Sequence, residues 1–190
     1  SGCRILMYHS LKRNLLKDKY NIYNLDPKVF ESQIKLLYHF SKNNSLNNVV
    51  PLIEGVSKGE GFVISFDDGY LDTLSTAAPI LNKYKFPFVV FISPKAIIDN
   101  NRNYLSVSNL KELASLPGIT IGAHGFSHCR LTKCDDRKLE LELVKSKQWL
   151  EDTLSVSIKT MSYPYGAFDN RVREAVLKAG YDLALSSRFG

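Results

Sequence analysis

The sequence is poor in cysteine and has no long apolar run. Its 190 residues include three cysteines, Cys3, Cys129 and Cys134, and this small, odd number argues against a disulfide framework. No apolar stretch reaches the ~18 residues of a membrane-spanning helix, and the first residues do not resemble a secretion leader. With 44% hydrophobic and 23% charged residues, the composition excludes disordered, collagen-like and coiled-coil proteins. It fits one globular domain over residues 1–190.

Acidic residues are outnumbered by basic ones. There are 25 lysines and arginines against 19 acidic residues, which gives a net charge of +6 and raises the question of a nucleic-acid partner. The basic residues are scattered, however, with dense groups at Lys17–Lys19 and Lys145–Lys147, and no nucleic-acid recognition motif is present. We therefore expect a solvated basic surface and no nucleic-acid partner.

Short apolar segments alternate along the chain with segments of helical periodicity. The apolar segments are continuous runs, which is typical of buried strands in a parallel sheet covered by helices. This order predicts an α/β fold, either an open sheet or an incomplete (β/α) barrel. The expected strands are 3–8, 61–66, 86–93, 119–123, 156–162 and 181–186. One helix is expected to start at Asp26-Pro27 and a second to end near Tyr84. Three further helices are expected at 108–116, 135–154 and 169–180.

Polar side chains follow several of these strands directly. His9 follows the first strand, Asp67 and Asp68 follow the second, and His124 follows the fourth, with His128 on the same loop. Because ligands bind at the carboxyl ends of parallel strands, all of these residues are expected on one functional rim.

Each of these features alone also fits a structural role. Asp67-Asp68-Gly69 is a common turn, His9 could be a core histidine, and residues 163–166 (Tyr-Pro-Tyr-Gly) could be only a tight turn. Their joint occurrence at strand ends favours function. The fourth histidine, His39, lies within a predicted helix, where a packing or surface role is expected.

The residue types on this rim indicate a divalent metal site. One carboxylate and two imidazoles leave coordination positions open, which is the catalytic rather than the structural pattern for Zn²⁺ or a related ion. The second carboxylate would then serve as a base toward water, and His9 as a general acid. The rival arrangement is a closed structural zinc site made by His124, His128, Cys129 and Cys134.

Three motifs carry a resemblance to a known family. Residues 65–70 (SFDDGY), 124–128 (HGFSH) and 162–166 (SYPYG) resemble the three motifs of the polysaccharide deacetylases, the NodB-homology domain of carbohydrate esterase family 4. Residues 5–10 (ILMYHS) resemble the N-terminal segment of the circularly permuted branch, which includes poly-β-1,6-N-acetylglucosamine deacetylases. The resemblance implies a distorted or incomplete (β/α) barrel with parallel strands and outer helices.

The resemblance also implies a reaction, namely metal-dependent removal of N-acetyl groups from a glycan such as poly-N-acetylglucosamine or peptidoglycan, with release of acetate. The implied metal is one Zn²⁺, with Co²⁺, Ni²⁺ or Fe²⁺ as alternatives, and the implied location is the cell envelope, with the cytoplasm as the alternative. An inactive glycan-binding module of the same fold is the alternative function. The implied roles are metal ligation by Asp68, His124 and His128, base catalysis by Asp67, acid catalysis by His9, and an oxyanion contact from the Tyr165 N–H.

Two departures from the family pattern bear on these roles. Gly125 stands where many members have Ser or Thr, and Ser162 stands where typical members have an arginine that orients the base. A carboxylate near His9 is expected to raise its pKa. Tyr70, Tyr163 and Tyr165 are expected to be exposed near the rim, where they would suit stacking on sugar rings. For Tyr163, packing under the loops is an equal alternative.

Overall fold

The computed structural model describes residues 2–12, 23–43 and 48–187, so the basic group Lys17–Lys19 lies outside the described residues. Between the named elements lie a π-helical turn at Thr73–Ala77 and two 3-10 turns, Leu131–Lys133 and Pro164–Gly166. In chain order the helices and strands are β1 (Arg4–Tyr8), α1 (Pro27–Asn43), α2 (Leu52–Lys58), β2 (Phe62–Phe66), α3 (Ala78–Lys83), β3 (Phe88–Ile92), α4 (Pro94–Ile98), α5 (Val107–Ser115), β4 (Ile119–Ala123), α6 (Asp136–Leu154), β5 (Thr160–Ser162), α7 (Asn170–Lys178) and β6 (Leu183–Leu185).

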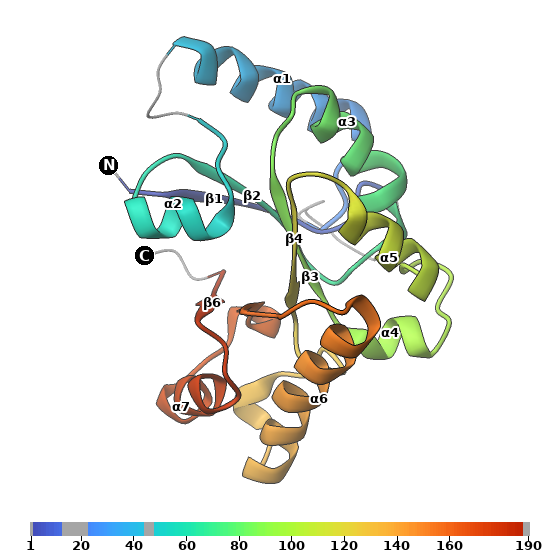
Figure 1. Ribbon diagram of the computed structural model, residues 1–190, viewed down its shortest axis with the longest axis vertical. Helices are drawn as coiled ribbons and strands as arrows, with labels where there is room; N and C mark the ends of the chain where they lie inside the picture. Colours follow the sequence, from blue (N-terminus) through green and yellow to red (C-terminus); the bar gives the residue numbers. More distant parts are fainter. Residues whose placement is uncertain (1, 13–22, 44–47, 188–190) are drawn as a thin grey trace.

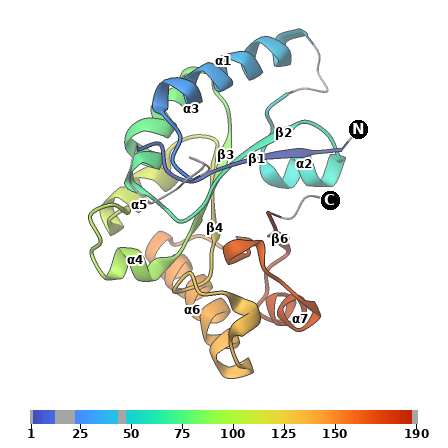
Figure 2. The same ribbon diagram turned by 180° about the vertical axis from the view of Figure 1, so that it is seen from behind.

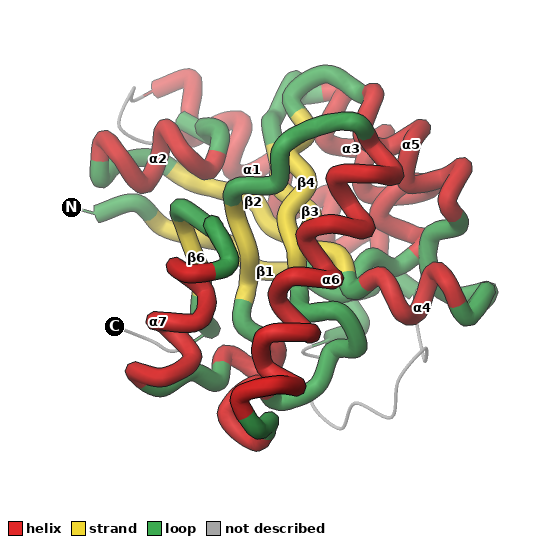
Figure 3. The backbone as a smooth tube through the Cα atoms, turned by 60° about the horizontal axis from the view of Figure 1, so that its bottom comes forward, coloured by secondary structure: helices red, strands yellow, loops and turns green. Residues whose placement is uncertain are grey.

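The described strands form one six-stranded parallel sheet in the order β1-β2-β3-β4-β5-β6. The helices follow one another around its outside, from α1 and α3 at the top of Figure 1, past α5 on the right, to α6 and α7 at the bottom. The first and last strands lie toward the same side of the molecule when it is seen from behind (Figure 2). Seen from below, the strands are gathered in the centre with helices around them (Figure 3).

The sheet is strongly curled. β3 and β4 lie between β2 and β5, so β2 and β5 would be about 14 Å apart in a flat sheet. Yet the Ser162 hydroxyl at the end of β5 lies 3.1 Å from Asp67 Oδ2, just past the end of β2. Such a contact requires the sheet to bend around on itself. The predicted incomplete (β/α) barrel with parallel strands and outer helices is thereby confirmed.

The alternating strand residues build two apolar clusters, one on each face of the sheet. The larger cluster fills the space between the sheet and the outer helices, with Ile64 of β2 and Phe30 of α1 among its members. The smaller lies inside the curl, where Val63 and Phe91 meet the half-buried Leu183 of β6. A Cβ at Gly122 would lie 2.6 Å from the Phe91 ring, so only glycine leaves room for this inner packing.

Some local expectations were wrong. The run at 3–8 was expected to be buried, but Ile5 and Met7 are 39% and 40% exposed because β1 is the edge strand and pairs with β2 alone among the described strands. The strand expected at 156–162 is paired only over Thr160–Ser162, and helices α2 and α4 were not anticipated. Within the described residues, no helix combines the length and apolar character needed to cross a membrane.

Candidate metal centre and active site

The candidate site lies at the carboxyl ends of β1, β2 and β4. The Asp67 N–H donates to the Tyr8 carbonyl oxygen over 2.9 Å, which continues the pairing of β1 with β2. This register places His9 beside Asp67, each being the first residue after its strand. The His124 N–H donates to the Ile92 carbonyl over 2.8 Å and holds His124 at the end of β4. The structure therefore brings the strand-end residues to one rim.

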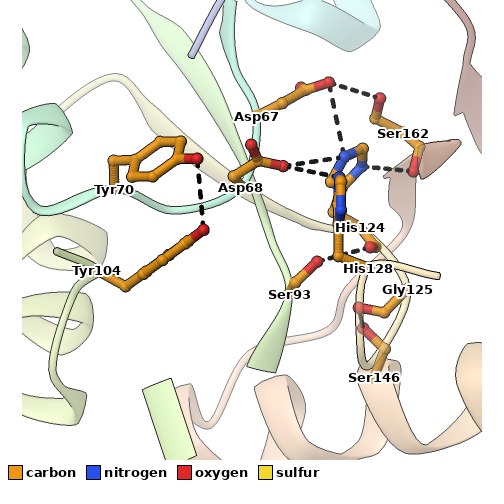
Figure 4. Close-up of polar contacts among 10 residues, drawn as sticks. All are labelled: Asp67, Asp68, Tyr70, Ser93, Tyr104, His124, Gly125, His128, Ser146 and Ser162. Carbon is orange, nitrogen blue, oxygen red and sulfur yellow. Dashed lines mark hydrogen bonds and ion pairs between the residues drawn. The ribbon is translucent and has the colours of Figure 1, made fainter. Parts of the chain in front are cut away.

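Asp68, His124 and His128 form a compact cluster. Asp68 Oδ1 lies 3.0 Å from His128 Nε2 and 3.4 Å from His124 Nε2. One potential ligand atom from each residue lies within 4.8 Å of the others, and no other such group of three exists among the residues that the structure describes. Figure 4 shows the three side chains converging, with Asp67 beside them. The rival zinc site is not assembled, since Cys129 and Cys134 lie outside this group.

Contacts around His124 orient its ring toward Asp68. Its Nδ1 lies 2.8 Å from the Ser162 carbonyl oxygen, which can only accept, so this nitrogen carries the proton. The other nitrogen, Nε2, is then left with a lone pair directed at the carboxylate side of the cluster. Fixing a histidine tautomer by a backbone carbonyl is the usual way in which proteins prepare a metal ligand.

The two neighbouring carboxylates have opposite pKa shifts. Burial raises the pKa of Asp67. Burial also acts to raise the pKa of Asp68, but the imidazoles of His124 and His128 outweigh it and hold that pKa far below its usual range. Burial acts to lower the pKa of His124, and the Asp67 and Asp68 carboxylates reverse this and raise it.

Unpartnered oxygens show that this donor set fits a divalent cation. Asp67 Oδ1 and Asp68 Oδ1 are buried and accept no hydrogen bond from the described residues, and the nearest cationic partner of Asp68 Oδ1 is the His128 imidazole, with Nε2 at 3.0 Å. A buried carboxylate oxygen without a donor is costly unless a positive charge compensates it. A Zn²⁺-like ion on Asp68, His124 and His128 would supply that charge with ligand types that suit it.

Ser162 contacts the residue assigned as the base. Its hydroxyl donates to Asp67 Oδ2 over 3.1 Å, while its carbonyl holds His124. The position that carries an arginine in typical family members therefore still contacts the first aspartate, through a neutral and shorter side chain. The sequence shows that the arginine is missing, but its pattern does not indicate that Ser162 contacts Asp67.

His9 lies near the cluster but is not part of it. Its ring packs edge-to-face against Tyr23, with 4.8 Å between ring centroids. Burial lowers the pKa of His9, and this effect exceeds the opposing influence of the Asp67 and Asp68 carboxylates. The expectation of a raised pKa is wrong because it considered the nearby negative charge and not the loss of hydration.

Tyr165 flanks the cluster on its exposed side. Its ring centroid lies 4.7 Å from that of His128, and the Arg130 guanidinium lies 4.9 Å from the Tyr165 ring centroid. Tyr165, Asp68 and His128 all have positive φ angles, of 61°, 74° and 57°. Left-handed backbone at non-glycine residues is unfavourable and concentrates at functional sites, which suits this location.

A buried glutamate anchors the loop that carries both histidines. Glu142 on α6 accepts hydrogen bonds from the Ser127 N–H at 2.8 Å and from the Ser127 hydroxyl at 2.5 Å. Ser146, one turn further along α6, donates to the Gly125 carbonyl over 3.1 Å. These contacts from α6 hold the loop although Gly125 has no hydroxyl. These contacts were not predicted from the sequence, although a Glu and a Ser on the buried stripe of a helix were a usable signal.

A cavity of 240 Å³ lies beside the cluster. Tyr104 lines it and stacks on Tyr70 at 4.6 Å between ring centroids, with a hydrogen bond of 3.3 Å from the Tyr104 hydroxyl to the Tyr70 hydroxyl (Figure 4). Tyr70 is buried, so its expected exposure is wrong, and Tyr163 is also buried, which agrees with the packing alternative. Tyr165 is 57% exposed. The cavity is lined by Asp68, Ser93, Lys95, Ala96, Asp99, Asn101, Tyr104, Ser127 and His128.

Comparisons with known proteins found similar sequences. Residues 55–184 match the family model described as polysaccharide deacetylase. YxkH of Bacillus subtilis, assigned as a polysaccharide deacetylase, is 28% identical over 98% of this chain and 64% of its own length. Poly-β-1,6-N-acetyl-D-glucosamine N-deacetylase of Staphylococcus aureus is 29% identical over 86% of this chain and 61% of its own length.

Solved structures establish the same fold. The Streptococcus pyogenes deacetylase PplD, solved in complex with acetate, superposes with a TM-score of 0.83 at 18% identity, over 100% of this chain and 85% of PplD. The chain spans about six-tenths of the length of the curated relatives it matches. The family-model match begins at residue 55, after His9 and β1.

Proposed function

We propose, given that this chain belongs to the polysaccharide deacetylase family, that it is a metal-dependent hydrolase removing N-acetyl groups from an N-acetylated amino-sugar glycan. The observation that carries this proposal is the Asp68, His124 and His128 cluster with Asp67 beside it. A divalent ion at this cluster, Zn²⁺ before Co²⁺, Ni²⁺ or Fe²⁺, would polarise the acetyl carbonyl and make water more acidic.

Asp67 is proposed as the general base. Its Oδ1 accepts no hydrogen bond from the described residues, so that oxygen is available to take a proton from the attacking water. The Ser162 hydroxyl holds the other oxygen and fixes the orientation of the carboxylate. Burial raises the pKa of Asp67, which makes it a stronger base than an exposed aspartate.

His9 and Tyr165 are proposed to act on the departing amine and on the oxygen of the attacked carbonyl, respectively. His9, beside Asp67 on the neighbouring strand, would donate a proton to the departing sugar amine. The Tyr165 N–H would donate to the oxygen that becomes negative when water attacks the carbonyl. Its strained φ of 61°, next to His128, supports a specific backbone orientation at this point.

The substrate is proposed to be a polymer or oligomer of N-acetylglucosamine type, such as poly-N-acetylglucosamine or peptidoglycan, which suits a location in the cell envelope. The 240 Å³ cavity, with Lys95, Asp99 and Asn101 in its lining, offers charged and polar groups to sugar hydroxyls. A glycan-binding module without turnover is the alternative. It gains no support from a site in which a buried Asp67, with one carboxylate oxygen that accepts no hydrogen bond from the described residues, lies beside a candidate metal cluster.

Acetate release tests this proposal. Protein stripped of metal and then supplied with Zn²⁺, Co²⁺ or Ni²⁺ should release acetate from N-acetylglucosamine oligomers or peptidoglycan, and chelator should abolish the release. Asp67→Asn should retain the metal and lose turnover, Asp68→Ala should lose both, and the exposed Asp152→Asn should change neither. Glycan binding without acetate release in any metal-loaded sample would favour the binding module.

A further inference from the structure

Two cysteines face each other immediately after the candidate metal ligand His128. The Sγ atoms of Cys129 and Cys134 lie 3.2 Å apart, and both residues are free thiols. The 3-10 turn Leu131–Lys133 lies between them, so they mark the two ends of one short loop. The third cysteine, Cys3, packs against the cluster inside the curl with Leu52 and Val63 and belongs to a different part of the fold.

We propose that Cys129 and Cys134 form a reversible disulfide that fastens the His128 loop to the start of α6. A disulfide bond is ~2.05 Å long, so the sulfurs must approach by about 1 Å, which small side-chain rotations can supply. The turn between the two cysteines is already held, since the Cys134 N–H donates to the Leu131 carbonyl over 3.1 Å and the Lys133 N–H to the Arg130 carbonyl over 2.9 Å. Cys129 is partly exposed and offers an oxidant access to the pair.

The oxidant is a low-molecular-weight disulfide, and the bond forms by two exchange steps. A deprotonated cysteine sulfur attacks the oxidant, forming a mixed disulfide and releasing one oxidant thiolate. The second cysteine sulfur, also deprotonated, attacks the first and releases the second oxidant thiolate. Two electrons pass from the protein sulfurs to the oxidant, and the two cysteine protons end on the two released thiols.

The position of the pair indicates what this bond would do. Cys129 directly follows His128, whose backbone is strained at a φ of 57°. Cys134 directly precedes Asp135, the N-cap of α6, whose side chain accepts from the Lys138 N–H over 2.7 Å. The disulfide therefore restrains His128 relative to a long helix and slows its departure from the cluster. This effect on metal retention rests on the proposed function, whereas the disulfide itself does not.

The disulfide is tested on the metal-free full chain. Oxidised glutathione at about pH 8.5 should reduce the number of reactive thiols from three to one and lower the mass by about 2 Da, with the loss mapped to the peptide holding positions 129 and 134. The thermal midpoint should rise by on the order of 4–8 °C and return on reduction, as a bond closing so short a loop permits. The Cys3→Ser variant should behave in the same way, and Cys134→Ser should show no rise.

Three results would overturn the inference. One is a stable glutathione adduct on Cys129 without internal bond formation, and another is an oxidised protein with an unchanged midpoint. The third is Zn²⁺ held by the thiols in Asp68→Ala, because that would make the pair a metal site. Metal-loaded protein gives a separate readout, in which oxidation should slow Zn²⁺ loss to a chelator several-fold. If the disulfide forms but this rate is unchanged, the effect on His128 is refuted while acetate release still decides the proposed function.

Discussion

Replacing Glu142 should weaken the metal site from a distance. Glu142 lies on α6, contributes no atom to the Asp68 cluster, and accepts both hydrogen-bond donors of Ser127. Hydrogen bonds to a charged group contribute ~1.5–3 kcal/mol each. Water can reach the half-buried Ser127 and replace part of this, so Glu142→Ala should lower the free energy of unfolding by about 2–4 kcal/mol. At 2–4 °C per kcal/mol the thermal midpoint should fall by roughly 4–16 °C.

Glu142→Ala should also lower the affinity of the site for Zn²⁺, because Ser127 lies directly before His128 and shares its loop. Removing the contacts that orient a ligand weakens metal binding by about 10–100-fold. The assay is Zn²⁺ competition against a calibrated chelator, together with thermal midpoints of the metal-free variants. Glu142→Gln keeps the volume and one acceptor and should lie between Glu142→Ala and the wild type. Glu140→Ala, on the exposed face of the same helix, is the matched control and should match the wild type. Wild-type Zn²⁺ affinity in folded Glu142→Ala would refute the argument.

Three further predictions concern the residues around the cluster. Ser162→Ala should lower kcat by about tenfold and leave the Zn²⁺ content unchanged. The substitution removes the hydroxyl that orients Asp67 and keeps the backbone carbonyl that orients His124. Loss of Zn²⁺ from this variant would contradict the prediction. His9→Ala should retain the metal and lower kcat by about 10²–10⁴, whereas a normal kcat in folded, metal-loaded protein would show that His9 is only a packing residue. Because burial raises the pKa of Asp67, the metal-free wild type should lose stability relative to Asp67→Asn as pH rises above the unfolded pKa of ~3.9 and through the folded value. Thermal midpoints from pH 4 to 7 measure that difference, and a wild type that gains stability relative to Asp67→Asn as pH rises would show that the pKa is not raised.

The rim of the site could be predicted because it depends on local pattern and one topological rule. A continuous apolar run followed by Asp67-Asp68, and another followed by His124, places these residues wherever parallel strands end. The partners could not be predicted in the same way. Ser162 contacts Asp67 only because the sheet curls, and Glu142 contacts Ser127 only through the packing of α6.

The errors in the fold have similar physical causes. An apolar run does not reveal whether a strand has neighbours on both sides, so β1 looked buried and is an edge strand. Residues before Thr160 look like a strand, but the Ile158 N–H donates to the Glu151 carboxylate over 2.9 Å and does not join the sheet. For His9, the competing effects of burial and charge can be weighed only after its depth in the fold is known.

Because the sheet is curled, binding of a cation at the Asp68 cluster and closure of the sheet would each favour the other. An ion that draws Asp68 toward His124 pulls the end of β2 toward the end of β4, and so favours the more tightly closed sheet. The same linkage runs in reverse. Leu183 of β6 makes no contribution to the cluster, yet it packs inside the curl against the apolar residues of β2 and β3. A substitution of this side chain that changed how far the sheet closes would therefore be expected to change the affinity of the Asp68 cluster for an ion.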